Sequence, residues 1–333
     1  MRALLSKAVG GPDTLALTDL PEPVAGQGQV VIAVRACAIN YPDVLIIEDR
    51  YQFKPPRPFA PGGEIAGVVD SVGEGVTGWA PGDRIMGVIG HGGLAEKIAV
   101  DPSRLFRLPA ERSFAAGAAL ILTYGTAIHA LLDRGRLTAG QSLLVLGAAG
   151  GVGLAAVELG KAFGARVVAA VSSAEKAAAC LAAGADETIV YGAAPFDQAA
   201  SRALAERFKA AGGAAGFDVI CDPVGGDYAE AALRSIGWEG RYLVVGFPAG
   251  IPRLPLNLTL LKSCDVCGVF WGAFAARDPA ANTAHVEHLF RLWADGRIAP
   301  RVTEVFPFER GGDAITRMAA RGAIGKLVVA VSS

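Results

Sequence analysis

The sequence predicts an α/β protein in which a β-rich N-terminal domain precedes a doubly wound, six-stranded parallel sheet. Residues 1–110 are mostly short strand-like runs separated by Gly- and Pro-rich turns, a spacing typical of a compact, partly closed β-domain. After Ser113, short apolar runs alternate with Ala- and Leu-rich helical segments. That alternation is typical of a parallel sheet whose strands are joined by crossover helices.

The individual elements follow from hydrophobic periodicity and from the turns between them. In the β-rich region the clearest strands are Val30–Ala38, Ile65–Val72 and Ile85–Ile89. The strands of the parallel sheet are expected at Leu143–Leu146, Arg166–Val171, Thr188–Tyr191, Phe217–Cys221, Arg241–Val245 and Asp265–Phe270. Helices are expected between most of them, at Leu154–Phe163, Glu175–Ala183, Gln198–Ala211 and Tyr228–Ser235.

The last part of the chain returns to mixed character, with helices at Ala284–Asp295 and Gly311–Arg321 and strands at Val302–Phe308 and Lys326–Val331. Roughly 60 residues are too few for an independent domain with a good core, so this tail is expected to pack onto the N-terminal domain. The sequence thus predicts a discontinuous first domain, residues 1–123 and 272–333, and a nucleotide-binding domain, residues 124–271.

Composition excludes several classes of protein. Hydrophobic residues make up 52% of the 333 residues and charged residues 19%, which favours a large core over disorder. The net charge is -1 and no basic block occurs, so neither nucleic acid nor a membrane surface is an expected partner. Without a long apolar run or a secretory leader, a cytoplasmic location is expected. The 5 cysteines are interpreted as reduced thiols, and the Cys264–Cys267 pair lacks the second pair that a zinc site needs.

The strongest functional motif is Ala148-Ala149-Gly150-Gly151-Val152-Gly153, which lies between a strand and a helix. Residues without bulky side chains let the backbone approach a pyrophosphate, and the start of the helix offers free N–H groups. The pattern is a variant of the dinucleotide fingerprint, with Ala148, Gly150 and Gly153 at the three glycine positions. It predicts nucleotide binding by Ala149, Gly150, Gly151 and Val152.

The residues after the second strand indicate which nucleotide binds. Chains that bind unphosphorylated NAD usually carry Asp or Glu there, to hold the ribose hydroxyls. This chain has Ser172 and Ser173, followed by Lys176, and these groups suit a 2′-phosphate. NADPH is therefore the expected cofactor. A second interpretation, compatible with the first, is that Ser172 caps the following helix, and Glu175 is a local argument against phosphate binding.

Taken together, the motifs resemble the medium-chain dehydrogenase/reductase superfamily, and within it the zeta-crystallin-like quinone oxidoreductase branch. The resemblance covers essentially the whole chain and implies a GroES-like domain combined with a Rossmann domain. It rests on the stretches 38–43, 61–67, 73–76, 81–84, 148–153, 171–176 and 222–226, and on Gly325-Lys326.

The resemblance also shows what is missing. Zinc alcohol dehydrogenases of this superfamily carry a catalytic Cys at the position of Asn40 and a His at that of Gly63, and neither replacement is a good zinc ligand. The structural zinc lobe needs four closely spaced cysteines, yet none lies between Cys37 and Cys180. No metal is expected, which favours reduction of activated acceptors over oxidation of alcohols.

The resemblance implies that Asn40, Tyr41, Tyr51 and Thr126 lie beside the nicotinamide and the substrate. Asn40 and Thr126 are expected to hydrogen-bond the carboxamide or the acceptor oxygen. Tyr41 or Tyr51 is expected to donate a hydrogen bond or a proton to that oxygen. The alternative for each tyrosine is a packed ring with a surface hydroxyl. Asp43 and Glu64 are expected to hold loops together.

Further cofactor contacts are implied by the same resemblance or by position at strand ends. Tyr191 is expected near the adenosine phosphate. Two pairs follow the fifth and sixth strands, Gly246 with Phe247 and Phe270 with Trp271, where ligands bind in open α/β sheets. The second pair is alternatively part of the core. Lys326 is expected to approach the cofactor, or alternatively to be a solvated surface lysine.

The sequence thus predicts an NADPH-dependent, zinc-independent reductase of quinones or α,β-unsaturated carbonyls. One alternative is a reductase of 2-enoyl thioesters, and another is a nucleotide-binding protein without turnover. The partner is then a small electrophilic substrate. The resemblance also implies a homodimer that pairs the sixth strand, Asp265–Phe270, with its symmetry mate.

Overall fold

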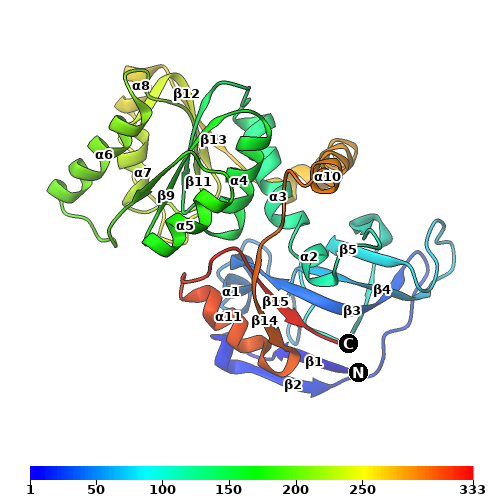
Figure 1. The fold of residues 1–333 in the computed structure, drawn as a ribbon. Coiled ribbons are helices and arrows are strands. Elements are labelled where there is room, and N and C mark those ends of the chain that lie inside the picture. The colour runs from blue at the N-terminus through cyan, green and yellow to red at the C-terminus, as the bar shows by residue number, and fades with distance from the viewer. Residues whose placement is uncertain (333) are drawn as a thin grey trace. The chain divides into compact units, whose positions relative to one another are not determined.

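A computed structural model describes residues 1–332 and divides the chain into two compact units (Figure 1). The first unit comprises Met1–Leu122 and the segment that starts at Pro300. The second comprises Thr123–Ala299. No helix among the described residues is long and apolar enough to cross a bilayer.

The first unit is built on a mostly antiparallel sheet with the strand order β14-β15-β3-β4-β5-β7, and β6 pairs with β3 off this path. The C-terminal strands enter the sheet because β15 pairs antiparallel with β3 and parallel with β14. A separate two-stranded ribbon consists of β1 and β2. The strand bounds are β1 Arg2–Ser6, β2 Leu15–Asp19, β3 Val30–Ile39, β4 Glu64–Val72, β5 Arg84–Val88, β6 Lys97–Val100, β7 Leu105–Arg107, β14 Val302–Pro307 and β15 Lys326–Ala330.

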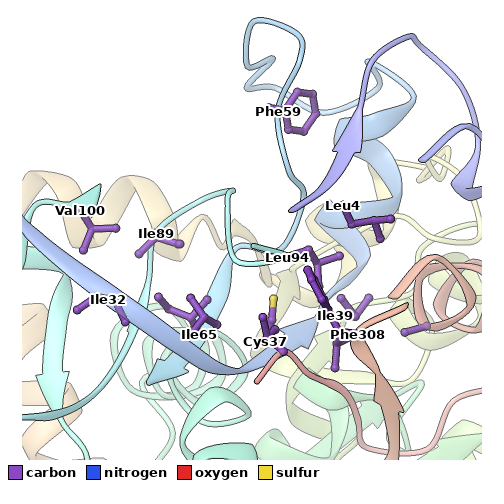
Figure 2. Close-up of a cluster of buried hydrophobic side chains, with 14 of the residues drawn as sticks. Leu4, Ile32, Cys37, Ile39, Phe59, Ile65, Ile89, Leu94, Val100 and Phe308 are labelled. Atoms are coloured by element: carbon purple, nitrogen blue, oxygen red, sulfur yellow. The ribbon is translucent and has the colours of Figure 1, made fainter. Parts of the chain in front are cut away.

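The core of this unit is aliphatic and is centred on β3. Figure 2 shows Cys37 and Ile39 of β3 beside Ile65 of β4 and Leu94 of a following loop, all fully buried. Burial raises the pKa of the Cys37 thiol well above its usual value. The helices of the unit are α1 Tyr41–Ile47, α2 Phe114–Ala118 and α11 Gly311–Ala319, with 3-10 turns at Pro12–Thr14, Pro102–Arg104 and Phe308–Arg310.

The second unit contains six parallel strands in the order β10-β9-β8-β11-β12-β13, the order of a Rossmann sheet. Their bounds are β8 Ser142–Leu146, β9 Arg166–Val171, β10 Glu187–Val190, β11 Phe217–Asp222, β12 Ile236–Val244 and β13 Asp265–Gly268. The helices are α3 Ile121–Ile128, whose first two residues still belong to the first unit, a π-helix His129–Arg134, α4 Gly151–Ala162, α5 Ala174–Ala182, α6 Gln198–Gly212, α7 Tyr228–Leu233, α8 Asn257–Lys262, α9 Trp271–Arg277 and α10 Pro279–Ala294. The predicted α/β fold class is confirmed.

Helices cover both faces of this sheet. Leu144 and Leu146 of β8 point into a core shared with Phe208 of α6 and with α7. On the opposite face, Gly160 of α4 lies so close to Leu143 and Val167 that a Cβ there would approach them to within 3 Å. Alternation of side chains along each parallel strand therefore produces two apolar faces, as a doubly wound sheet requires.

The observed boundaries differ from the sequence expectation at the end of the sheet. The sixth strand, β13, ends at Gly268, and Trp271 begins α9 instead of extending the strand. Residues 272–299 belong to the second unit, although the sequence placed them with the first. The reason is local packing, because α10 contacts the second unit's helices: its His288 lies 5.8 Å from the ring of Phe163 at the end of α4.

Candidate active site

The glycine turn after β8 has the geometry that backbone recognition of a phosphate needs. Gly147 adopts a left-handed φ of 55°, and the N-cap of α4 is Gly150, which makes no side-chain cap to the first N–H groups of the helix. A Cβ on Gly153 would lie 2.4 Å from the Gly147 carbonyl oxygen, whereas one on Gly150 would meet nothing closer than 3.4 Å. Gly153 is therefore required for packing, and Gly150 leaves the first turn of the helix open toward a ligand.

A cationic, hydroxyl-bearing group follows β9. Nζ of Lys176 donates a hydrogen bond to Oγ of Ser172 across 3.1 Å, and the Ser172 side chain is exposed. The N-cap of α5 is Ser173, whose Oγ accepts from the Lys176 N–H at 3.2 Å. The expectation that Ser172 caps the helix is thus wrong by one residue. That shift places the exposed Ser172 hydroxyl outside the helix cap, beside the Lys176 ammonium.

Tyr191 lies directly after β10 and contacts the glycine turn. Its hydroxyl interacts with the backbone of Gly147, and its ring packs on Tyr228 at 4.6 Å between centroids. The side chain is buried, which raises the pKa of the Tyr191 hydroxyl far above its usual value. Tyr191 therefore stabilises the glycine turn. The sequence predicts only a contact between Tyr191 and the adenosine phosphate, and not this role.

The loop after β11 is organised by Asp222, a residue to which the sequence analysis gave no role. Its Oδ1 accepts from the N–H groups of Val224 and Gly225, each at 2.8 Å, and its Oδ2 accepts from the Tyr242 hydroxyl at 2.5 Å. Burial raises the pKa of this carboxyl. The sequence feature that could have indicated this role of Asp222 is its place at the end of an apolar strand, directly before Pro-Val-Gly-Gly.

Other predicted cofactor residues lie at the same carboxyl edge of the sheet. Gly246 and Phe247 follow β12, and Phe247 packs against Gly225. Phe270 and Trp271 differ in burial. Phe270 is exposed, whereas Trp271 is buried and packs on Gly125, the residue before Thr126. The alternative prediction, that this aromatic pair belongs to the core, is therefore correct for Trp271 only. The topology thus brings the predicted cofactor residues of this unit to one edge.

The first unit carries a second polar cluster, built from the ends of three adjacent strands. Asn40 follows β3, Glu64 begins β4 and Lys326 begins β15. The strand pairing aligns Leu327 with Ile39 and Ala38 with Glu64, which places the three side chains at the same end of the sheet. All three are buried, at 6% exposure or less. The interpretation of Lys326 as a solvated surface residue is wrong.

These three side chains form one hydrogen-bonded network. Nζ of Lys326 lies 2.5 Å from Oδ1 of Asn40 and 2.9 Å from Oε2 of Glu64. Nδ2 of Asn40 donates to the same Glu64 oxygen at 3.1 Å. The other Glu64 oxygen accepts from the backbone N–H of Leu122 at 2.8 Å. Glu64 therefore joins three segments of the chain, as the sequence predicts for a residue that holds loops.

Asp43 holds the neighbouring backbone. Its Oδ2 accepts from the Asn40 N–H at 2.8 Å, which completes a capping box at the start of α1, and its Oδ1 accepts from the Gly62 N–H at 2.9 Å. Burial raises the pKa of the Asp43 carboxyl to about 6, although these backbone N–H groups act in the opposite direction. The predicted loop-holding role of Asp43 is confirmed.

The two tyrosines of the first unit are half-buried. Tyr41 is the first residue of α1, and both it and Tyr51 pack against the aliphatic core described above. Burial, with the nearby Asp43 carboxylate as a second cause, raises the pKa of the Tyr51 hydroxyl. Tyr51 is thus a neutral phenol at physiological pH and can act as a hydrogen-bond donor.

Within residues 1–332, His, Cys, Asp and Glu side chains nowhere form a group of three that could hold a metal ion. At the position that the resemblance assigns to a zinc-binding Cys, the Asn40 amide binds an ammonium and a carboxylate. The positive charge of the Lys326 ammonium, 2.5 Å from the Asn40 oxygen, opposes the approach of a divalent cation.

Comparisons with known proteins match both halves of the chain. The model of the alcohol dehydrogenase GroES-like domain matches residues 26–110, and that of the zinc-binding dehydrogenase domain matches residues 151–285. The quinone oxidoreductase-like protein 2 homolog of Nematostella vectensis is 36% identical over 308 residues, covering 91% of this chain and 82% of that protein.

Solved structures agree with these matches. A probable oxidoreductase from Mycobacterium abscessus is 36% identical with a TM-score of 0.85, covering 99% of this chain and 98% of its own. The Escherichia coli quinone oxidoreductase complexed with NADPH is 27% identical with a TM-score of 0.89, covering 99% of this chain and 100% of its own. The chain therefore belongs to the medium-chain dehydrogenase/reductase superfamily, in its quinone oxidoreductase branch, and is an oxidoreductase.

Proposed function

We propose that the chain is an NADPH-dependent reductase that transfers hydride to quinones or α,β-unsaturated carbonyls without a zinc ion. The observation that carries the choice of cofactor is the Lys176–Ser172 pair at the end of β9. An ammonium beside a hydroxyl favours a 2′-phosphate, which a carboxylate at the same place would repel. The complex of the related Escherichia coli enzyme with NADPH supports this choice.

The residues of the second unit fit such a cofactor. The uncapped first turn of α4, from Gly150 to Val152, offers backbone N–H groups to a pyrophosphate. Ser172, Ser173 and Lys176 offer hydroxyls and a positive charge to the ribose phosphate. When bound, NADPH supplies the hydride for the electron-poor carbon of the acceptor, and a proton from a tyrosine or water completes the two-electron reduction.

Independence from zinc is supported by the chemistry of the polar cluster. Asn40 and Gly63 are poor zinc ligands, and the Asn40 oxygen already accepts from the Lys326 ammonium. Oxidation of an alcohol needs its hydroxyl to be polarised, whereas a quinone or an enone is electrophilic as it stands. The cluster therefore suits reduction of an activated acceptor better than dehydrogenation of an alcohol.

Tyr51 is proposed to donate a hydrogen bond to the acceptor oxygen as negative charge develops on it. Its raised pKa keeps the phenol protonated over the physiological range. Tyr51→Phe should lower kcat by about 10- to 100-fold with an unchanged Kd for NADPH, because a hydrogen bond to a charged group contributes about 1.5–3 kcal/mol. Tyr41→Phe is the matched comparison, because Tyr41 has the same chemistry and similar burial. Equal turnover in wild type and Tyr51→Phe would remove Tyr51 from the mechanism.

NADPH oxidation with a panel of quinones, enones and 2-enoyl thioesters tests the proposal directly. Turnover of quinones or enones with little activity on thioesters is the expected result. Selective turnover of thioesters would favour the enoyl thioester reductase instead. Tight NADPH binding without turnover of any acceptor would make the chain a nucleotide-binding protein and overturn the proposal.

We also propose that the protein is a homodimer joined through the edge strand of the parallel sheet. β13 is the last strand in the sheet order, so one side of its backbone has no partner strand within residues 1–332. Apolar side chains are exposed on and beside it: Val266 on β13, and Leu256, Leu260 and Leu261 at α8. Pairing with a second copy would cover both the open edge and these side chains.

A further inference from the structure

The strand order places Asp222 where the two halves of the parallel sheet meet. In the order β10-β9-β8-β11-β12-β13, the chain runs outward from β8 in one direction and from β11 in the other. A dinucleotide lies across the crevice at such a reversal, at the carboxyl ends of the strands. The glycine turn follows β8 on one side of this crevice, and the segment 223–226 follows β11 on the other. Asp222 is the last residue of β11, directly before that segment.

The segment 223–226 contacts the loops on both sides of it. A Cβ at Gly147 would lie 2.5 Å from a methyl carbon of Val224, so the Val224 side chain packs directly on the glycine turn. On the other side, the Val224 carbonyl accepts a hydrogen bond from the Ala249 N–H at 2.9 Å. The segment therefore links the glycine turn after β8 to the loop after β12, and Val224 makes both contacts.

The Asp222 carboxylate fixes the conformation of this segment. Its Oδ1 accepts from the backbone N–H groups of Val224 and Gly225, each at 2.8 Å. Its Oδ2 accepts from the hydroxyl of Tyr242, a fully buried residue of β12, so the neighbouring strand holds the carboxylate in turn. Asp222 is only 2% exposed. It therefore acts on a ligand through the backbone that it holds, and not by contact.

We propose that Asp222 is a positioning residue for the dinucleotide: with Tyr242 it holds Val224 against the glycine turn and so fixes the crevice in which NADPH lies. The inference rests on the proposed function for its cofactor alone, since Asp222 has no part in hydride transfer. Backbone that is already fixed in the free protein need not be ordered on binding, and this strengthens binding. Without the carboxylate, two backbone N–H groups lose their acceptor and the segment loses its fixed conformation.

The first test compares two substitutions of Asp222. Asp222→Ala should raise the Kd for both NADPH and NADH by about 10-fold or more, because both nucleotides lie in the same crevice. Asp222→Asn should stay within about 3-fold of wild type, because its amide oxygen still accepts from both N–H groups and its NH2 can donate to the Tyr242 oxygen. An unchanged Kd in Asp222→Ala would overturn the inference. Equal weakening by Asn and Ala would also overturn it, because the charge and not the position would then matter.

Asp218→Ala is the matched control for these variants. Asp218 lies on the same strand, and its carboxylate accepts from the Ser142 N–H and hydroxyl, each at 2.7 Å. It therefore also joins β11 to β8, but at the amino end of the sheet, away from the crevice. Asp218→Ala should leave the Kd for both nucleotides unchanged. A rise equal to that in Asp222→Ala would assign the effect to a general loosening of the sheet and overturn the inference.

A fragment of the cofactor tests whether the effect lies at the crevice. Adenosine 2′,5′-bisphosphate carries the ribose phosphate but lacks the nicotinamide half, so it needs only the half of the site formed after β8 and β9. In Asp222→Ala its Kd should stay within about 3-fold of wild type while the Kd for NADPH rises, because only the whole dinucleotide spans both halves. Equal weakening of the fragment and of NADPH would overturn the inference.

Tyr242→Phe keeps the buried ring and removes only the hydroxyl, so it serves even where Asp222→Ala fails to fold. Hydrogen exchange of the free protein, followed by mass spectrometry, should become faster over residues 222–228 and stay unchanged over residues 143–146. The Kd for NADPH should rise by about 3- to 10-fold. Unchanged exchange over residues 222–228, or an unchanged Kd, would overturn the inference.

The outcomes for the inference and for the proposed function are distinguishable, because every measurement here is of binding or of exchange. A wild type that binds NADPH but reduces no acceptor would overturn the proposed activity and leave the role of Asp222 intact. A wild type that binds neither nucleotide would overturn both.

Discussion

Nζ of Lys176 donates a hydrogen bond to Oγ of Ser172 across 3.1 Å, at the carboxyl end of the second strand of the parallel sheet. The pair spans one turn at the start of α5, with Ser173 as the helix cap between them. A cation and a hydroxyl are thereby presented together, where a chain that binds unphosphorylated NAD would present a carboxylate.

The first prediction concerns the choice of cofactor. Lys176→Ala should raise the Kd for NADPH by about 10- to 100-fold, because hydrogen bonds to charged groups contribute about 1.5–3 kcal/mol each. The Kd for NADH should change little. Fluorescence titration with both nucleotides measures this, and Lys209→Ala, which removes a surface lysine from α6, is the control. Equal weakening of both cofactors would show that Lys176 does not recognise the 2′-phosphate.

The second prediction separates the two glycines of the phosphate turn. Gly153→Ala should destabilise the protein by about 1–3 kcal/mol, because its Cβ would collide with the Gly147 carbonyl and overpack the turn. Gly150→Ala has room for a methyl group and should leave the unfolding free energy nearly unchanged while weakening NADPH binding. Urea unfolding and a binding titration on both variants test this. Similar stability losses for the two variants would contradict it.

The third prediction follows from the raised pKa of Asp43, about 6 in the folded protein. The folded state keeps this proton to a higher pH than the unfolded chain, whose carboxyl ionises near pH 4. The contribution of Asp43 to stability is therefore present below about pH 4 and is lost as the pH rises toward about 6.

Asp43→Asn removes this titration. The difference in unfolding free energy between wild type and Asp43→Asn should accordingly fall between about pH 4 and pH 6 and stay constant above that range. Urea unfolding at several pH values measures the difference. A difference that rises with pH would mean that the carboxyl has a lowered pKa instead.

The fourth prediction concerns the proposed dimer. Leu260→Asp places a charge on the exposed apolar side of α8 and should convert the dimer to a monomer in light scattering at micromolar concentration. Val24→Asp is the control, because Val24 is also an exposed apolar residue but belongs to the first unit, which does not contain α8 or β13. A wild type that is monomeric under these conditions would contradict the dimer itself.

Much of the second unit could be predicted from local pattern. Each strand of the parallel sheet is a short apolar run bounded by Gly or a helix start, so all six were located within a few residues. The phosphate turn was recognisable because its chemistry requires small residues in consecutive positions. The error at Ser172 arose because two adjacent serines can each cap a helix, and only the backbone conformation distinguishes them.

The polar cluster could not be predicted in the same way. Asn40, Glu64 and Lys326 are up to 286 residues apart, and no local pattern states that three strand ends meet. In the sequence, a lysine that follows a glycine looks the same as the lysine of an ordinary surface turn. It becomes a buried partner of Glu64 only because β15 pairs with β3, and that pairing depends on tertiary structure.

The sequence by itself determined the fold class, the family and the location of the nucleotide turn, because each depends on short-range patterns of apolar, small and hydroxyl-bearing residues. The tertiary structure decided that Ser173 and not Ser172 caps α5, that Trp271 is buried while Phe270 is exposed, and that Lys326 lies in the core against Asn40. These outcomes depend on burial and on the register of strands distant in sequence. The free energy of a buried charge depends on its partner, and only the folded chain brings that partner within reach.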